Sequence, residues 1–122
     1  MTAKELLFKL PEALDAEGAG DLHAVVQYDV STPMYHVIDG GKAEAFEMDV
    51  GNPDDANAMA ERAVETFGSL DLHVNDAGVS INALFVDTPL EDWERVLRVN
   101  LTGAFLCGQA AARRMLKAGS GR

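Results

Sequence analysis

The polar residues that could bind a ligand or take part in chemistry gather at three places in the second half of the chain. Asp49 ends a strand-like stretch, the turn Asn75–Gly78 follows a short apolar stretch, and Asn100 lies inside a long helix-like stretch. A carboxylate accepts hydrogen bonds and an amide both donates and accepts, but an amide does not ionise and cannot act as a general acid. These residues therefore predict binding or positioning rather than proton transfer.

The remaining reactive side chains show no pattern for metal binding or nucleophilic catalysis. The three histidines, His23, His36 and His73, have a spacing that matches no metal-binding motif, so we interpret them as surface or core residues. Cys107 lies in an apolar stretch without an adjacent base, which favours a small core residue over a nucleophile. The sequence therefore predicts no metal site.

Composition bounds the class of protein and its partners. The chain has 122 residues, the length of a single domain. Of these residues 48% are hydrophobic and 25% are charged, and the net charge is −10. Nucleic acids and anionic membranes are themselves negative, so we expect neither as a partner. No apolar run approaches a membrane span of about 20 residues, the first residues lack the apolar core of a signal peptide, and a single cysteine permits no internal disulfide, so we expect a cytoplasmic protein.

The first half predicts a helix followed by an antiparallel meander. Residues 4–10 suggest a short helix that Pro11 ends. Residues 22–30 alternate in character like a half-buried strand, residues 34–38 form a second strand, and residues 42–50 form a third. The sequence Asp-Gly-Gly at 39–41 favours a tight hairpin because glycine accepts the positive φ of such turns.

The second half changes to the rhythm of a parallel α/β unit. A helix is expected over 53–67, with Asn52 as its N-cap and Gly68 as its stop, then a strand over 70–74 and one long helix over 90–117. The predicted fold is α/β: a small sheet, made of the meander and the strand at 70–75, packed by two to three helices. The sequence predicts a single domain over 1–122 that is not a complete Rossmann fold.

Residues 48–122 resemble the short-chain dehydrogenase/reductase family. The matching stretches are 48–50 (Met-Asp-Val), 75–78 (Asn-Asp-Ala-Gly) and 99–105 (Val-Asn-Leu-Thr-Gly-Ala-Phe), in the family's order. The resemblance implies NAD(P) as cofactor, an Asn100 that supports a proton relay, and four cofactor-binding positions: Asp49, Asn75, Ala77 and Gly78. Two positions depart from the family's pattern: Asp76 replaces the second asparagine of the turn, and His73 stands where an aliphatic residue is usual.

Two features that this family's chemistry requires do not occur in the 122 residues. Dinucleotide binding needs a glycine-rich turn after a strand, whereas Gly18 and Gly20 precede one. Hydride transfer also needs a Tyr-x-x-x-Lys pair, but Thr32 follows Tyr28 by four residues and Asp39 follows Tyr35. The leading expectation is therefore no autonomous catalysis, with no catalytic residue, Asn100 as a vestigial match and at most weak NAD(P) binding. An alternative is a vestigial oxidoreductase subunit completed by another chain.

Residues 4–47 resemble the opening of sterol-carrier-type lipid-binding domains, which begin with a helix and a meander. This second resemblance implies a chimeric chain with a junction near 46–48 and, as a further alternative, an apolar small molecule as ligand.

We expect a homodimer that forms through the long helix at 90–117. Between Val99 and Ala112 the polar side chains are few, so apolar residues cover most of the circumference. A helix that is apolar nearly all round must be buried on more than one side. The basic residues at its end, Arg113, Arg114, Lys117 and Arg122, are accounted for by the negative end of the helix dipole.

Overall fold

The computed structural model describes residues 23–29, 33–39 and 42–122. They form a four-stranded sheet covered by helices, with β1 (His23–Asp29), β2 (Pro33–Asp39), β3 (Lys42–Glu47) and β4 (Leu72–Val74). The predicted helix at 4–10 lies outside the described residues. The predicted strands at 42–50 and 70–74 are shorter in the structure. The first ends at Glu47 because the Asn52 N–H bonds the Asp49 carbonyl in a turn that leads into the next helix.

The strand order is β3-β2-β1-β4, with β1 and β4 parallel and both meander pairings antiparallel. Strands β1, β3 and β4 therefore run in one direction and β2 runs against them. A doubly wound Rossmann sheet also begins with the order 3-2-1-4, but with all strands parallel. Here the three residues before β2 and the two residues after it are far too few for a parallel crossover, which needs about a dozen. The small number of connecting residues thus explains the reversed strand.

Helix α3 (Pro53–Phe67) has the boundaries that its capping residues predict. The Asn52 side-chain oxygen accepts a hydrogen bond from the Asp54 N–H at 2.9 Å. Gly68 ends the helix with a φ of 87°, a conformation that glycine adopts without steric cost. One face of the helix is apolar and buried, with Ala56, Met59, Ala60 and Ala63.

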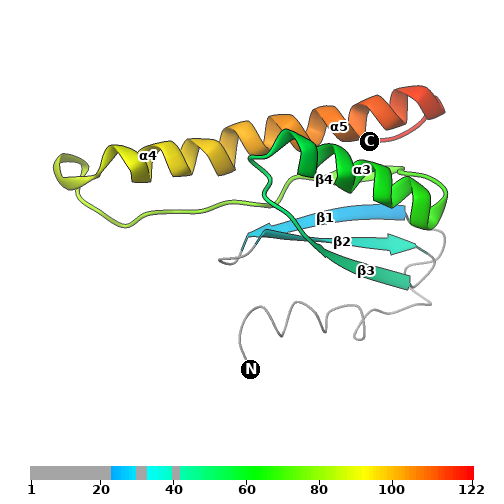
Figure 1. Cartoon of the computed structure of the whole chain (residues 1–122), viewed down its shortest axis with the longest axis horizontal. Coiled ribbons are helices and arrows are strands. Elements are labelled where there is room, and N and C mark those ends of the chain that lie inside the picture. Colours follow the sequence, from blue (N-terminus) through cyan, green and yellow to red (C-terminus); the bar gives the residue numbers. More distant parts are fainter. Residues whose placement is uncertain (1–22, 30–32, 40–41) are drawn as a thin grey trace.

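The predicted single helix at 90–117 is a continuous helical run with an irregular middle. It consists of α4 (Leu90–Leu97), the π-helical segment η3 (Arg98–Gly103) and α5 (Ala104–Ala118), preceded by a short 3-10 turn, η2 (Phe85–Asp87). A π segment widens the helix and alters the direction of its side chains. In Figure 1 the run lies beside α3 above the sheet, and α4 projects beyond the end of the strands.

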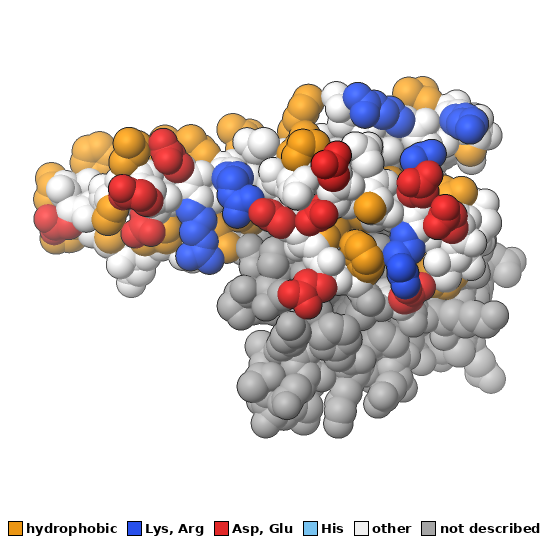
Figure 2. Space-filling model, in the orientation of Figure 1, with side chains coloured by type: hydrophobic (Ala, Val, Ile, Leu, Met, Phe, Trp, Pro, Cys, Tyr) orange, Lys and Arg blue, Asp and Glu red, His pale blue; other side chains and the backbone are white. Residues whose placement is uncertain are grey.

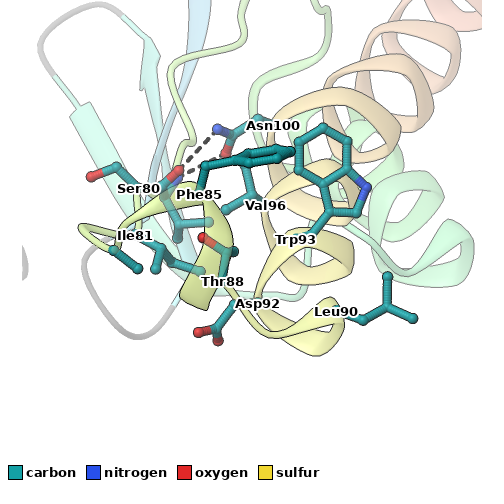
Figure 3. Close-up of a pocket in the computed structure, with 11 residues that line it drawn as sticks. Ser80, Ile81, Phe85, Thr88, Leu90, Asp92, Trp93, Val96 and Asn100 are labelled. Carbon is teal, nitrogen blue, oxygen red and sulfur yellow. Dashed lines mark hydrogen bonds between the residues drawn. The ribbon is translucent and has the colours of Figure 1, made fainter.

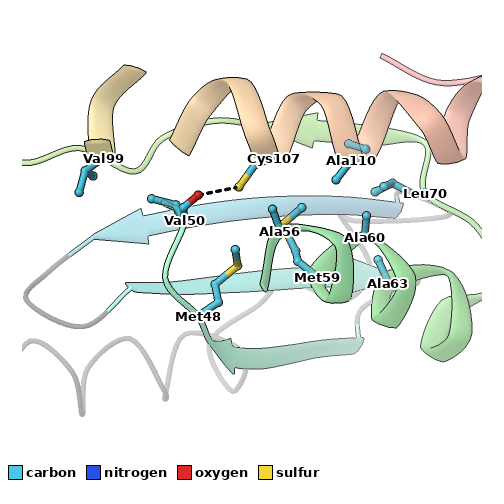
Figure 4. Packing of buried hydrophobic residues seen from close by; sticks show 11 residues of the cluster. Met48, Val50, Ala56, Met59, Ala60, Ala63, Leu70, Val99, Cys107 and Ala110 are labelled. Carbon is cyan, nitrogen blue, oxygen red and sulfur yellow. Dashed lines mark hydrogen bonds between the residues drawn. The ribbon is translucent and has the colours of Figure 1, made fainter. Parts of the chain in front are cut away.

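The core lies between α3, α5 and the segment that joins β3 to α3 (Figure 4). Its buried members are mostly small or flexible: Met48, Val50, Ala56, Met59, Ala60, Ala63, Leu70, Val99, Cys107, Ala110 and Ala111. Facing alanines let the two helices approach closely. The prediction of Cys107 as a small core residue is confirmed, because its side chain is fully buried.

The chain also returns to the sheet after α5. The Arg122 N–H donates to the Asp71 carbonyl, and the Arg122 carbonyl accepts from the His73 N–H, both at 2.9 Å. This alternation is the pattern of a parallel pairing. Arg122 therefore pairs with β4 on the edge away from β1.

The packing yields a matched pair of glycine substitutions. Gly103 has ordinary helical angles, but a Cβ there would lie 2.6 Å from Val50 Cγ2. We expect Gly103→Ala to lower the free energy of unfolding by about 1–3 kcal/mol, the usual cost of overpacking. Urea unfolding at one protein concentration measures this change.

The control is Gly108→Ala, whose Cβ would meet its nearest neighbour, Asn75 Nδ2, at an ordinary 3.5 Å. It should be neutral or stabilising by up to about 1 kcal/mol, because alanine favours helix over glycine. A Gly103→Ala variant as stable as the unsubstituted protein would contradict the packing argument.

Candidate functional site

The three sequence motifs converge on the π segment and the first turn of α5. The turn at 49–51 reaches this part of the helix through Arg98 and Val50, and the turn at 75–79 reaches it through Asn75 and Asn100. Both turns follow strands that run in the same direction, β3 and β4, so they lie at the same edge of the sheet. This edge is where open α/β sheets bind ligands.

Asp49 sits in a tightly bonded turn. Its Oδ1 accepts from the Gly51 N–H at 2.9 Å, and its Oδ2 pairs with Arg98 Nη1 at 2.5 Å. Its own N–H donates to the Asp55 carboxylate, and its carbonyl accepts from the Asn52 N–H. The carboxylate is 41% exposed, so it remains open to solvent while both oxygens have protein partners.

Asn75 connects the end of β4 to the long helix. Its Nδ2 donates to the Ala104 carbonyl at 3.2 Å, at the junction of η3 and α5. Its Oδ1 lies 2.9 Å from His73 Nε2. Because a carbonyl oxygen can only accept, the imidazole must donate through Nε2. The histidine thus fixes the orientation of the amide.

Asn100 holds the end of the same turn with two hydrogen bonds. Its Oδ1 accepts from the Val79 N–H at 2.8 Å, and its Nδ2 donates to the Val79 carbonyl at 2.9 Å (Figure 3). The side chain therefore pairs with Val79 as a neighbouring strand would. Gly78 lies next to this amide, and a Cβ there would be 3.6 Å from Asn100 Oδ1. Ala77 and Val79 pack against the core.

The arrangement holds backbone segments in place. Its side chains are the amides of Asn75 and Asn100, the Asp49–Arg98 ion pair and the His73 imidazole, which donates to Asn75. Among the described residues, no group of three histidine, cysteine or acidic side chains could hold a metal ion. This part of the chain therefore supports positioning as the role of the motif residues.

Sequence reasoning did not identify Arg98 as a member of the site. It lies 49 residues from Asp49 along the chain, and its guanidinium covers Gly51, where a Cβ would lie 2.5 Å from Nη1. Its position two residues before Asn100 gave no signal, because residues two apart on a helix point to different sides. Val79 could not be found from its side chain, since it takes part only through its backbone.

A cavity of about 670 Å³ opens between the loop at 79–88 and α4 (Figure 3). Its wall is mainly apolar, with Ile81, Phe85, Trp93 and Val96 around the half-buried Asp92. Asn100 borders the cavity, but its amide is committed to Val79.

In the part of the chain that the structure describes, none of the helices has the length and apolar character to cross a membrane.

The Asn100 contacts predict a local effect of substitution. Asn100→Ala removes both hydrogen bonds to Val79, which should accelerate hydrogen exchange at the Val79 amide and cost about 1–2 kcal/mol of stability. Gln109→Ala, on an exposed face of the same helical run, is the matched control and should leave that amide unchanged. Equal exchange rates at Val79 in the two variants would contradict the assigned role.

His73 predicts a dependence of stability on pH. Burial lowers its pKa from 6.5, and the hydrogen bond to Asn75 opposes this shift only in part. Because the pKa of His73 is lower in the folded chain, the unfolded chain binds the imidazole proton more tightly. The contribution of neutral His73 to stability should therefore be fully present above about pH 6.5 and should be lost as the pH is lowered. The carboxylates also titrate on acidification, so the comparison is with His73→Val, which should lose less free energy of unfolding between pH 7.5 and 5.5. Parallel stability profiles for the two proteins would show that His73 does not contribute.

The comparisons with known proteins show one family across nearly the whole chain. The family model described as enoyl-(acyl carrier protein) reductase matches residues 8–122. A 3-oxoacyl-[acyl-carrier-protein] reductase of Synechocystis sp. is 38% identical over 70% of this chain and 35% of its own length. An uncharacterised oxidoreductase of Escherichia coli, YohF, is 36% identical over 88% of this chain and 38% of its own length. The chain thus spans about a third of the length of these curated relatives.

Solved structures agree with this assignment. A short-chain type dehydrogenase/reductase from Mycobacterium marinum superposes with a TM-score of 0.57 at 38% identity, over 58% of this chain and 29% of that one. ElxO with NADP bound superposes with a TM-score of 0.58 at 30% identity, over 62% of this chain and 31% of that one.

The match also bears on the sequence hypotheses. It runs through the expected junction at 46–48 and includes most of the segment that resembled a sterol-carrier domain, so nothing in the comparisons supports a second origin. The chain belongs to the short-chain dehydrogenase/reductase family.

Proposed function

We propose that these 122 residues act as a nucleotide-facing scaffold of a short-chain dehydrogenase/reductase and carry no autonomous hydride-transfer chemistry. The proposal rests on one observation. The helical run fastens the turns at 49–51 and 75–79 at one edge of the sheet. Two of the residues that it holds, Asp49 and Asn75, are ones that the family resemblance links to the cofactor.

The adenosine end of NAD(P) fits the side chains at this edge. Each carboxylate oxygen of Asp49 has one protein partner and can accept a further hydrogen bond, and the side chain is open to solvent. The exocyclic amine of adenine is a donor of the required kind. A relative in the same fold has NADP bound, which supports the same class of ligand.

The diphosphate end does not fit equally well. The 122 residues contain no glycine-rich turn between a strand and a helix N-terminus, and their net charge of −10 repels a pyrophosphate. The sequence also offers no Tyr-x-x-x-Lys pair to supply a proton. We therefore assign the chain a weak adenosine contact and assign it no step of the reaction.

The proposal predicts weak, localised binding of NAD and NADP. Calorimetry should give a Kd no tighter than about millimolar, near −4 kcal/mol. Amide chemical-shift changes on titration should be confined to residues 49–51 and 75–79. Asp49→Asn removes the charge that holds Arg98. This substitution should alter the titration-induced shift changes at residues 49–51 more than those at residues 75–79.

Two results would overturn the proposal. Micromolar affinity for either dinucleotide would mean that the chain holds the diphosphate as well. Turnover of alcohols or ketones that disappears in Asn100→Ala would mean that these residues do catalyse, because a contaminating enzyme would not respond to that substitution.

A further inference from the structure

The cavity between the loop at 79–88 and α4 has the size of a small-molecule site. Its volume of about 670 Å³ falls within the range of roughly 300–1,000 Å³ that is usual for pockets that bind small organic ligands. Asp49, the carboxylate of the proposed adenosine contact, is not part of its wall. The proposed function therefore leaves this cavity unused.

One face of the helical run forms a wall of the cavity. Asp92, Val96 and Asn100 all line it and are spaced four residues apart, which places them in one row on the helix. At one end of the row Asn100 bonds the backbone of Val79, so that end is engaged with the protein itself. Asp92 lies at the other end, in the first turn of α4 (Figure 3). The row is about 12 Å long at 1.5 Å per residue, which suits a ligand of several heavy atoms in length.

Asp92 is the unpartnered carboxylate of this wall. Its side chain is half-buried, and it makes no hydrogen bond or ion pair with any residue that the structure describes. The helix dipole favours an acid in the first turn, but it favours the neighbouring Glu91 as well, which is exposed. The dipole therefore does not explain why a carboxylate lies against apolar side chains, where its partial removal from water costs free energy. A cationic ligand would offset that cost.

The polar atoms that remain in the wall are mainly hydrogen-bond acceptors. The Asp92 carboxylate only accepts. The Thr88 hydroxyl already donates to the Leu84 carbonyl at 2.9 Å, so its oxygen is left to accept, and the Ser80 hydroxyl can do either. Acidic side chains lie among the hydrophobic ones at this projecting end of the molecule (Figure 2). A ligand that complements the wall must therefore donate hydrogen bonds and carry positive charge.

Two aromatic side chains give the cavity its apolar character. Phe85 lines it from the loop and is 94% exposed, and Trp93 lines it from the helix and is 54% exposed. The face of an aromatic ring attracts both cations and apolar groups. Ile81 and Val96 add aliphatic surface. An inorganic cation would leave this surface in water, so the wall favours a ligand with an apolar body.

We propose that the cavity binds a small organic amine, with its ammonium group beside Asp92 and its apolar body against Val96 and Phe85. An ammonium group supplies three donors and a positive charge, and hydrogen bonds between charged groups are the strong ones. A metal ion would need several oxygen ligands, whereas the wall offers a single carboxylate. A fatty acid would set its own carboxylate against Asp92. The charge of the wall thus selects amines among apolar ligands of similar size.

The binding of phenylbutylamine tests the ligand class, with phenylbutanol and phenylbutyrate as neutral and acidic probes of similar size. Trp93 is the single tryptophan of the chain, so its fluorescence reports the cavity directly. The amine should change this fluorescence saturably and should bind about tenfold more tightly than the alcohol, the effect of one charge-assisted hydrogen bond. Phenylbutyrate should bind more weakly than either. Equal affinities for the amine and the alcohol, or no saturable change with the amine, would overturn the proposal.

A pair of neighbouring acidic residues tests the position of the charge. Asp92→Asn should lower the affinity for phenylbutylamine by about tenfold and leave the affinity for phenylbutanol unchanged. Glu91→Gln removes the same charge from the exposed position beside it and should leave both affinities unchanged. An equal loss in the two variants would mean that the negative charge of the whole region attracts the amine, which would contradict a site at Asp92.

A pair of neighbouring apolar residues tests the position of the ligand's body. Phe85 and Leu84 are both exposed, but Phe85 alone of the two lines the cavity. Phe85→Ala should weaken the binding of the amine and the alcohol alike, and Leu84→Ala should weaken neither. If both variants bind like the unsubstituted chain, the probes lie elsewhere and the proposal fails. It also fails if affinity falls as the protein concentration is raised, because a second copy of the chain would then fill the cavity instead.

Discussion

The close approach of Gly103 to Val50 is the contact on which the rest of this structure depends. Only a residue without a Cβ permits the helix to lie so near the segment that joins β3 to α3. Cys107, one turn further on, then lies beneath the Val50 carbonyl, and Val99 closes the core on the other side. The helix is thereby fixed in depth over the sheet. Because this depth is fixed, the polar side chains of the helix can reach two turns that are distant from each other in sequence.

The π segment sets the rotation of the helix, as the glycine sets its depth. Its wider turn shifts α4 relative to α5, so that Arg98 is directed at Asp49 while Asn100 is directed at Val79. Asn75 bonds the Ala104 carbonyl where the π segment ends. Extra residues in a helix are retained where they serve a local purpose. Here that purpose is to let one helix hold both turns at the edge of the sheet.

Local signals predicted much of the fold, and long-range contacts limited the rest. Asn52, Pro53 and Gly68 marked both ends of α3, because capping acts within a few residues. The few residues on either side of β2 likewise excluded a parallel crossover and required the meander. The π segment was missed because one widened turn hardly changes the apolar periodicity of a 28-residue prediction. The Arg98–Asp49 pair and the Asn100–Val79 bonds were missed because nothing in a sequence pattern states which backbone group or charge a side chain will meet in space.

His73 shows how a site of this kind can be held together by residues that look catalytic. Its imidazole donates to Asn75 Oδ1, which leaves Nδ2 of the same amide free to donate to the Ala104 carbonyl. The cost is a buried ring nitrogen, Nδ1, that has no partner among the described residues, and a pKa that burial lowers. An aliphatic residue would avoid this cost but would leave the amide free to rotate. The amides of Asn75 and Asn100 are thus engaged with backbone groups, and so the presence of a family's motif residues is evidence of its architecture before it is evidence of its chemistry.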